Sequence, residues 1–296
     1  MFFWMLAAAL PGLFWEQGPR TAPTLKAAGI ECVHVATMAD AWKNSGLCAV
    51  ATDLASYQKL PQPGVDFRPD VARATSAPWV NSNGWRLVRA AGRPVYYDAV
   101  KGQPELCAAE AFAYGANALV RVDPAGLERF AAMLRFLKTV DAPPLPPRAN
   151  IGFVDDGSAE AGEVMNLLTR RNLLFRIVTA PDSSLDLNIR LGPPANPAEF
   201  VAMVRQKLGD EKRLLRIYGS EVVIGRLTGD GSRCRLHLLN YGGRKVEGLR
   251  VRLLGVYKKS QLSAPGGGAV SDFVAADGAT EFSLPALDAY AIIDLM

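Results

Sequence analysis

A helix–strand–helix segment between Glu105 and Val140 constrains the fold of this 296-residue chain more than any other stretch. It begins with a small-residue helix from Leu106 to Tyr114, continues with an apolar strand from Ala118 to Val122, and opens a second helix at Asp123. The apolar residues of the second helix recur on one face at helical spacing; they are Leu127, Phe130, Ala131, Leu134 and Leu137. This order of elements is typical of a parallel α/β sheet. The segment therefore predicts the closing unit of a barrel or open sheet that starts near the N-terminus.

The residues before this segment show the same alternation of strands and helices. Apolar runs predict strands within Pro11 to Gly18, at Ile30 to Ala36 and at Leu47 to Thr52. The stretch 11–142 holds about half of the roughly 250 residues that an eight-stranded barrel normally needs. The sequence therefore predicts a partial or degenerate (β/α) barrel over residues 11–142.

The proline cluster from Pro143 to Pro147 predicts a linker, because clustered prolines stiffen the chain and block regular structure. Beyond it, short apolar strands alternate with helical patterns, and Asn196 followed by Pro197 is a typical capped helix start. This predicts a small α/β domain over residues 148–212. From residue 213 the apolar period changes to two and glycine-rich turns separate the strands, which predicts an antiparallel β-sandwich over residues 213–296. The predicted fold class is α/β plus all-β.

Charge and the N-terminal residues bear on partners and location. The formal net charge is only +4 and the arginines are scattered, so we expect no nucleic-acid partner. No apolar run of membrane-spanning length follows the first stretch, so we expect no membrane span. Residues 1–10, MFFWMLAAAL, are similar to the apolar core of a secretory signal but lack the usual positive charge before it. Export to a secreted or periplasmic location is one interpretation; a first buried element in a cytoplasmic protein is the other.

The cysteines and histidines exclude several classes of chemistry. The four cysteines fit no metal-ligand spacing and are typical of buried apolar side chains, although Cys32 and Cys48 lie on predicted neighbouring strands and could pair in an exported protein. The two histidines, His34 and His237, fall in strands of different predicted domains. A histidine-assisted nucleophile or a histidine-bound metal is therefore not expected. Nucleotide-binding and serine-hydrolase motifs are absent, and we expect no cofactor.

Carboxylates are the remaining candidates for catalysis. Glu16, Asp53 and Asp123 follow predicted parallel strands, where barrel enzymes place their working residues. Two acids flanking a glycosidic bond are the minimum that sugar hydrolysis requires. In a closed barrel the first strand lies beside the last, which would bring Glu16 near Asp123. Capping is the competing interpretation for Asp53 and Asp123, and a structural role is equally open for Glu16.

Aromatic and amide side chains supply a candidate substrate-binding set. Rings stack on the apolar faces of sugars while amides and acids bond their hydroxyls. The candidates are Trp15, Trp79, Asn81, Asn83, Trp85, Tyr97, Asp98 and Glu110. The alternative is that several of these rings fill the core of a shortened barrel and that Glu110 is packed within its helix.

The predicted layout resembles that of barrel-type glycoside hydrolases, in particular the bacterial β-galactosidases. The stretches WVNSNGWRLVR, AEAFAYGANALVRVD and RLHLLNYGGRKVEGLRVRLLG carry the resemblance. It implies that the small α/β domain is flavodoxin-like or amidotransferase-like, that the partner is an oligosaccharide or polysaccharide, and that paired carboxylates hydrolyse it. Such enzymes usually place an acid/base glutamate beside an asparagine, and no Asn-Glu pair occurs here. The alternative is a non-catalytic carbohydrate-binding or assembly protein on a decayed glycosidase scaffold, and a homo-oligomer is left open.

Overall fold

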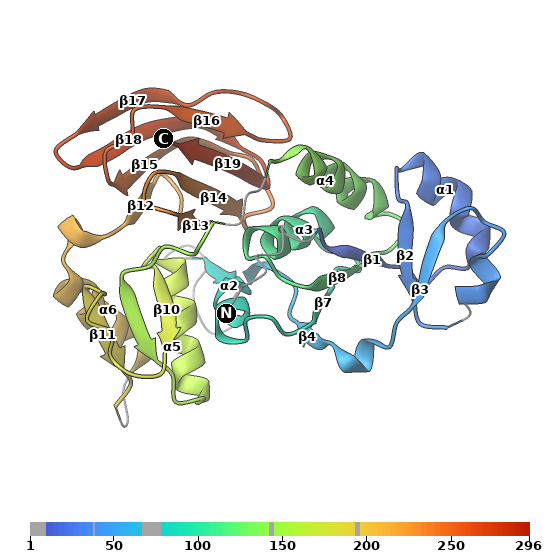
Figure 1. Ribbon diagram of the computed structural model, residues 1–296, viewed down its shortest axis with the longest axis horizontal. Coiled ribbons are helices and arrows are strands. Elements are labelled where there is room, and N and C mark those ends of the chain that lie inside the picture. Colours follow the sequence, from blue (N-terminus) through green and yellow to red (C-terminus); the bar gives the residue numbers. More distant parts are fainter. Residues whose placement is uncertain (1–9, 38, 67–77, 142–144, 193–195) are drawn as a thin grey trace. The chain divides into compact units, whose positions relative to one another are not determined.

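The computed structural model describes residues 10–37, 39–66, 78–141, 145–192 and 196–296 (Figure 1). The chain divides into two compact units, one formed by residues 1–64 and 90–144 and the other by residues 65–89 and 145–296. Residues 65–89 belong to the predicted N-terminal domain but fold with the second unit. The predicted boundary at the proline cluster, Pro143 to Pro147, coincides with residue 145, from which the rest of the chain belongs to the second unit.

The first unit is built on one six-stranded parallel sheet. Its strands, in spatial order, are β3 (Cys48–Ala51), β2 (Cys32–Val35), β1 (Gly12–Phe14), β8 (Ala118–Arg121), β7 (Val95–Asp98) and β4 (Gln58–Leu60). The first strand pairs with the last, with Phe14 level with Arg121. Strands that are neighbours in this sheet follow one another along the chain, and the first strand lies beside the last, as in a barrel. Closure would also require β3 to pair with β4, and no such pairing occurs within the described residues. A parallel sheet is therefore present, and a closed barrel is not confirmed.

Three α-helices of the first unit connect or follow these strands: α1 (Ala22–Ala27), α3 (Pro104–Ala113) and α4 (Leu127–Thr139). Short 3-10 turns add η1 (Pro19–Thr21), η2 (Ala39–Trp42) and η3 (Leu54–Ser56). Pro104 begins α3 at a position where its missing N–H costs nothing. The predicted apolar face of α4 buries Leu127, Phe130 and Leu137, with Phe130 fully inaccessible. Burying each such side chain contributes about 1.5–3 kcal/mol.

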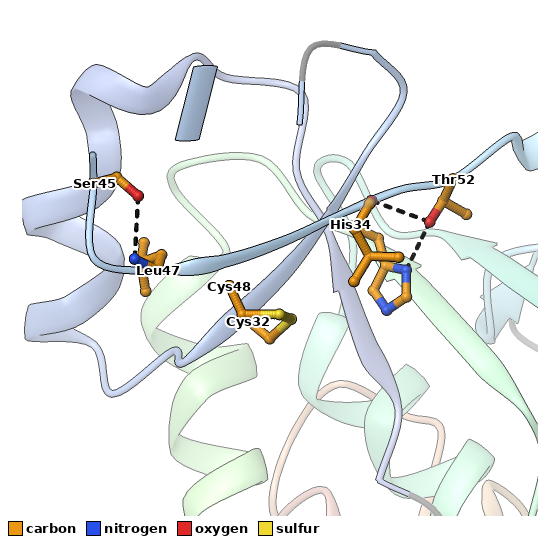
Figure 2. Close-up of a disulfide and its surroundings, with 7 residues drawn as sticks. Cys32, His34, Ser45, Leu47, Cys48 and Thr52 are labelled. Atoms are coloured by element: carbon orange, nitrogen blue, oxygen red, sulfur yellow. Dashed lines mark hydrogen bonds between the residues drawn. A yellow bond between two sulfur atoms is a disulfide. The ribbon is translucent and has the colours of Figure 1, made fainter. Parts of the chain in front are cut away.

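A disulfide joins the two outermost strands at one side of this sheet (Figure 2). Cys32 of β2 is level with Cys48 of β3, so the two sulfur atoms meet across neighbouring strands. The pairing that the sequence left conditional is therefore present in the structure. Cys107 and Cys234 are free and buried, as expected for small apolar side chains.

The second unit contains a three-stranded parallel sheet with two helices. The sheet order is β10 (Phe175–Val178), β9 (Ile151–Val154), β11 (Leu187–Arg190), and the helices are α5 (Ala159–Arg170) and α6 (Pro197–Leu208). Asn196 caps α6, since its side-chain oxygen accepts from the backbone N–H of Ala198 at 2.9 Å. This confirms the capped helix start. A turn, η4 (Asp210–Lys212), follows.

Residues 64–89 form β5 (Gly64–Asp66), β6 (Trp79–Asn81) and α2 (Gly84–Arg89). The β5 and β6 strands make a two-stranded sheet, and α2 packs against α5. Two contacts hold α2 there. The guanidinium of Arg89 donates twice to the carboxylate of Asp155, with both distances 2.8 Å, and the ring of Trp85 lies against Gly162.

The rest of the second unit consists of two four-stranded antiparallel sheets. One has the order β12 (Leu215–Tyr218), β15 (Val246–Leu254), β18 (Ala279–Leu287), β17 (Ser271–Ala276), and the other β13 (Val223–Gly229), β14 (Cys234–Asn240), β19 (Tyr290–Leu295), β16 (Ser260–Ser263). Alternate residues of both sheets join one hydrophobic cluster that includes Leu236, Val251, Phe282 and Ile293. The period of two in the sequence produces this cluster, because alternate side chains of a strand point to the same face.

Candidate functional site

Four charged side chains gather at the carboxyl ends of the parallel strands in the first unit. Lys59 lies on β4, Asp98 ends β7, Arg121 ends β8, and Glu16 follows β1. Asp98 is level with Arg121, which is level with Phe14, so Glu16 two residues further on extends the same row. We call Lys59, Asp98, Arg121 and Glu16 the charged row. It carries two positive and two negative groups.

Arg121 is the centre of the charged row. Its guanidinium donates from Nε to Asp98 Oδ1 at 3.0 Å and from Nη2 to Asp98 Oδ2 at 2.6 Å. The third nitrogen, Nη1, donates to Glu16 Oε1 at 3.0 Å. Lys59 Nζ donates to Asp98 Oδ2 at 3.1 Å. One guanidinium therefore bridges the two carboxylates through the fork geometry that suits arginine.

The electrostatics of the charged row keep Asp98 ionised. Burial opposes ionisation, but hydrogen bonds from Arg121 and Lys59 outweigh it and lower the pKa of the Asp98 carboxyl. The hydrogen bond to Asp98 in turn raises the pKa of Arg121. Glu16 has half of its side chain exposed and Lys59 more than half, so solutes reach both ends of the row. The row can accept and donate hydrogen bonds, and Asp98 is not a proton donor at neutral pH.

Asp53 and Asp123 use their carboxylates on the local backbone. Asp53 Oδ1 accepts from Ala55 N–H at 2.9 Å and caps η3. Asp123 Oδ1 accepts from Gly126 N–H at 2.8 Å, before α4. The capping interpretation thus describes Asp53. The N-cap of α4 is Gly126, without a side-chain cap hydrogen bond, so Asp123 instead holds the turn before that helix, and its Oδ2 accepts from Lys101 N–H at 3.3 Å. Arg121, and not Asp123, is the group on β8 that contacts Glu16.

Three of the predicted substrate-binding residues lie inside the first unit. Trp15 is 2% exposed and its indole N–H donates to the Thr21 hydroxyl at 2.9 Å. Tyr97 and Glu110 are fully buried; burial first, and the charge of Glu110 next, raise the pKa of Tyr97 well above its usual range. A side chain without exposed surface cannot stack on or bond a sugar. The expectation that these three line a groove is therefore corrected to a core role.

The remaining aromatic and amide candidates belong to the second unit. Asn83 is fully buried and its side-chain oxygen accepts from Arg86, while Trp85 packs against the cluster around β9, α5 and α6. Trp79 is half-buried, and the guanidinium of Arg170 lies 4.3 Å from its ring centre. Asn81 is half-buried and donates to Asp66 at 3.5 Å. For Asn83 packing is the observed role, which corrects the groove-lining expectation. Trp85 packs against the cluster but is only half-buried, so its groove-lining role stays a prediction.

Sequence reasoning missed Lys59 and Arg121. Acids were the groups expected to act at strand ends, and the arginine in the run ALVRVD stands two residues before Asp123. Neighbouring parallel strands end at the same edge of a sheet, so a basic residue at a strand end can pair with the acids at the ends of its neighbours. Arg121 at the end of a predicted strand was therefore a signal that the sequence offered.

No metal or membrane feature emerges from the described part of the chain. No group of three or more histidine, cysteine, aspartate or glutamate side chains there is placed to hold a metal ion. No helix there is long and apolar enough to cross a membrane.

Comparisons with known proteins identify a scaffold. No family model and no curated protein matches the sequence. Among solved structures, the α-L-fucosidase isoenzyme 2 from Paenibacillus thiaminolyticus is similar, with a TM-score of 0.56 and 11% identity over 87% of this chain and 70% of that one. A rhamnosidase from Novosphingobium sp. PP1Y gives a TM-score of 0.44 and 12% identity over 93% of this chain. A catalytic mutant of a GH42 β-galactosidase from G. stearothermophilus gives 0.41 and 7% identity over 80% of this chain.

These neighbours are glycoside hydrolases, and their likeness to this chain is one of fold. The chain spans 38% of the rhamnosidase and 53% of the β-galactosidase. By its likeness to the α-L-fucosidase the fold is glycosidase-like, and the particular resemblance to bacterial β-galactosidases stays a prediction.

Proposed function

We propose that this chain is a carbohydrate-binding protein on a glycosidase-like scaffold, and that the charged row binds an oligosaccharide or polysaccharide. The observation that carries the proposal is the single guanidinium of Arg121 bridging Asp98 and Glu16. Hydrolysis needs one carboxyl group that can give a proton to the leaving oxygen. Asp98, with its lowered pKa, serves as a hydrogen-bond acceptor instead.

The chemistry of the charged row suits sugar hydroxyls, which both donate and accept hydrogen bonds. The exposed part of Glu16 accepts from hydroxyl groups, and the exposed ammonium of Lys59 donates to them. Arg121 and Asp98 between them hold both groups at the edge of the sheet. The neutral sum of charges favours an uncharged glycan over an acidic one.

The test is a binding measurement on an array of neutral and acidic glycans, followed by titration calorimetry with those retained. Glu16→Gln should weaken binding about ten- to a hundredfold, because hydrogen bonds to a charged group are worth about 1.5–3 kcal/mol. Glu128→Gln is the matched control: Glu128 is also an exposed glutamate paired with an arginine in the first unit, through Arg135. A parent protein that retains no glycan, or equal losses in both variants, would sink the proposal.

Hydrolysis is the second candidate function, favoured by the pairing of β1 with β8, which brings Glu16 to the same edge as Asp98. The parent should then cleave a member of a broad glycoside panel, and Glu16→Gln should lower that rate by several orders of magnitude while binding persists. A panel without any cleaved member leaves the binding function as the sole candidate.

Assembly and location complete the proposal. A homo-oligomer is proposed without a defined interface, and sedimentation of the purified chain measures its oligomeric state.

Export to a secreted or periplasmic location is proposed from residues 1–10. Oxidising compartments preserve disulfides, so export predicts that Cys32 and Cys48 resist alkylation in freshly lysed cells until a reductant is added. Immediate alkylation of both thiols would place the chain in a reducing compartment.

A further inference from the structure

A pocket of about 210 Å³ lies in the first unit at the amino ends of β1 and β2. Residues before and within the two strands line one side, and the second half of α4 lines another. Most of its wall is apolar and comes from Leu10, Leu13, Ile30, Ala131 and Leu134. The charged row stands at the opposite, carboxyl ends of the strands, so this pocket is a separate site.

His34 lines this pocket together with the charged side chains of Glu31, Arg135 and Lys138. Its Nδ1 lies 2.8 Å from the hydroxyl oxygen of Thr52 (Figure 2). The Thr52 hydroxyl donates its one hydrogen to the backbone oxygen of Val50 at 3.2 Å. In that arrangement the hydroxyl accepts from His34, in the tautomer that carries the proton on Nδ1 and a lone pair on Nε2. Burial lowers the pKa of His34, which keeps the imidazole neutral near pH 7.

Gly12 gives Nε2 its space. A Cβ atom at position 12 would lie 3.0 Å from Nε2 of His34 and 2.7 Å from a methyl carbon of Leu119. Any larger residue at position 12 would crowd the imidazole. Both Gly12 and His34 line the pocket. A hydrogen-bond acceptor thus stands in an otherwise mainly apolar cavity.

The charged groups at the rim are already engaged with one another or with the backbone. Lys138 donates to Glu31 at 2.9 Å, and Arg135 donates to the backbone oxygen of Ala28 at 2.8 Å and to Glu128 at 2.6 Å. Recruiting either cation for an anionic ligand would cost these contacts. The pocket chemistry therefore suits an uncharged ligand that has an apolar body.

We propose that this pocket is a binding site for a small uncharged ring compound that donates one hydroxyl or N–H hydrogen to Nε2 of His34. The pocket volume agrees with this class of ligand. An apolar cavity of about 150 Å³ holds benzene, and the additional volume of this pocket can accommodate one small substituent on the ring. The site is independent of glycan binding at the charged row.

Phenol and toluene are the probes, since they share a ring and differ in the donor group. Phenol should bind the full chain about 3- to 10-fold more tightly than toluene, the range that one neutral hydrogen bond gives. The chain has two histidines, so selective ¹⁵N-histidine labelling yields two imidazoles, which the spectrum of His34→Phe assigns. Phenol should shift the Nε2 resonance of His34 and leave His237 unmoved.

Two variants separate recognition from folding. His34→Phe removes the acceptor and keeps a ring, so the preference for phenol over toluene should vanish while toluene still binds. Leu134→Trp fills the pocket from the half-buried face of α4, so both probes should lose at least tenfold in affinity. Ala132→Trp is the matched control, because Ala132 is exposed on the same helix and lines no part of the pocket.

Three results would overturn the inference. The first is no binding of either probe to a folded parent. The second is an unchanged phenol-to-toluene ratio in His34→Phe. The third is tighter binding of benzoate than of phenol, lost in Lys138→Gln, which would make the rim cations an anion site and the acceptor at Nε2 irrelevant.

Discussion

Arg121 decides what the carboxylates at the edge of the first sheet do. It holds Asp98 through two nitrogens and Glu16 through the third. Because an arginine remains charged at all ordinary pH values, the bridge depends on pH only through its carboxylates. The interaction turns two acids with catalytic potential into parts of one neutral row.

Removing the guanidinium of Arg121 should lower the free energy of unfolding. Arg121→Met leaves the partly buried Asp98 with Lys59 as its remaining partner in the charged row, and we expect a loss of about 1–3 kcal/mol in unfolding free energy. Urea denaturation at pH 7 measures it. Lys43→Met, which removes an exposed lysine paired with the exposed Asp40 in the same unit, should cost less. Equal losses would mean that the bridge adds nothing beyond a surface ion pair.

The same residues predict a pH dependence. The folded-state pKa of Asp98 is lowered, so its contribution to stability is fully present above the unfolded value of about 3.9 and is lost as pH falls through the folded value. Arg121→Met should therefore flatten the acid limb of the stability curve relative to the parent. Urea midpoints between pH 2 and pH 6 test this, and parallel curves for the two proteins would contradict it.

Trp85 is half-buried and packs against the core of the small α/β layer. Its ring lies against Gly162 of α5 and joins the cluster around β9 and α6. Trp85→Ala should cost about 3 kcal/mol of unfolding free energy, as expected for a truncated core ring. Trp79→Ala, at the other half-buried tryptophan in the same unit, is the comparison. Retained stability together with lost glycan binding in Trp85→Ala would restore the groove interpretation.

At the scale of elements, the disulfide fastens β3 to the first sheet. β3 is an edge strand of four residues and most of its side chains are exposed, so little apolar burial holds it. The bond closes a loop with a sequence separation of 16, for which chain entropy gives about 3 kcal/mol. Replacing both Cys32 and Cys48 with serine should lower the oxidised protein's stability by about that amount. Adding dithiothreitol should bring the parent to the level of the variant; a difference that persists would implicate packing instead.

The elements themselves could largely be predicted from local sequence. The apolar runs at β1, β2, β3 and β8 are short and end at turns, and the helical spacing of α4 is regular, so local pattern and final structure agree. The position of residues 65–89 could not be predicted, because it depends on Arg89 reaching Asp155 and Trp85 reaching Gly162, which are distant in sequence. Arg121 shows the same limit within the site, since its role arises from β1, β7 and β8 lying side by side.

At the scale of the whole molecule, the chain crosses between the units more than once, and this governs how it comes apart. Residues 65–89 fold with residues 145–296, although they are covalently continuous with the first unit on both sides. Cleavage within the proline cluster therefore breaks the covalent link between residues 65–89 and residues 145–296. The two parts of the second unit should stay together through their non-covalent contacts. A fragment that starts at Arg148 would lack α2, with its Arg89 bridge and its Trp85 ring.

Limited proteolysis should show this directly. After a cut near Pro143 to Pro147, denaturing electrophoresis should separate two pieces, while size-exclusion chromatography in native buffer should elute them together, because α2 remains bound to α5 through Arg89 and Trp85. Arg89→Ala combined with Trp85→Ala should weaken that hold, and the nicked variant should separate at protein concentrations where the nicked parent does not. Arg93→Ala, an exposed arginine just beyond α2, is the control. Spontaneous separation of the nicked parent would show that residues 65–89 are not integral to the second unit.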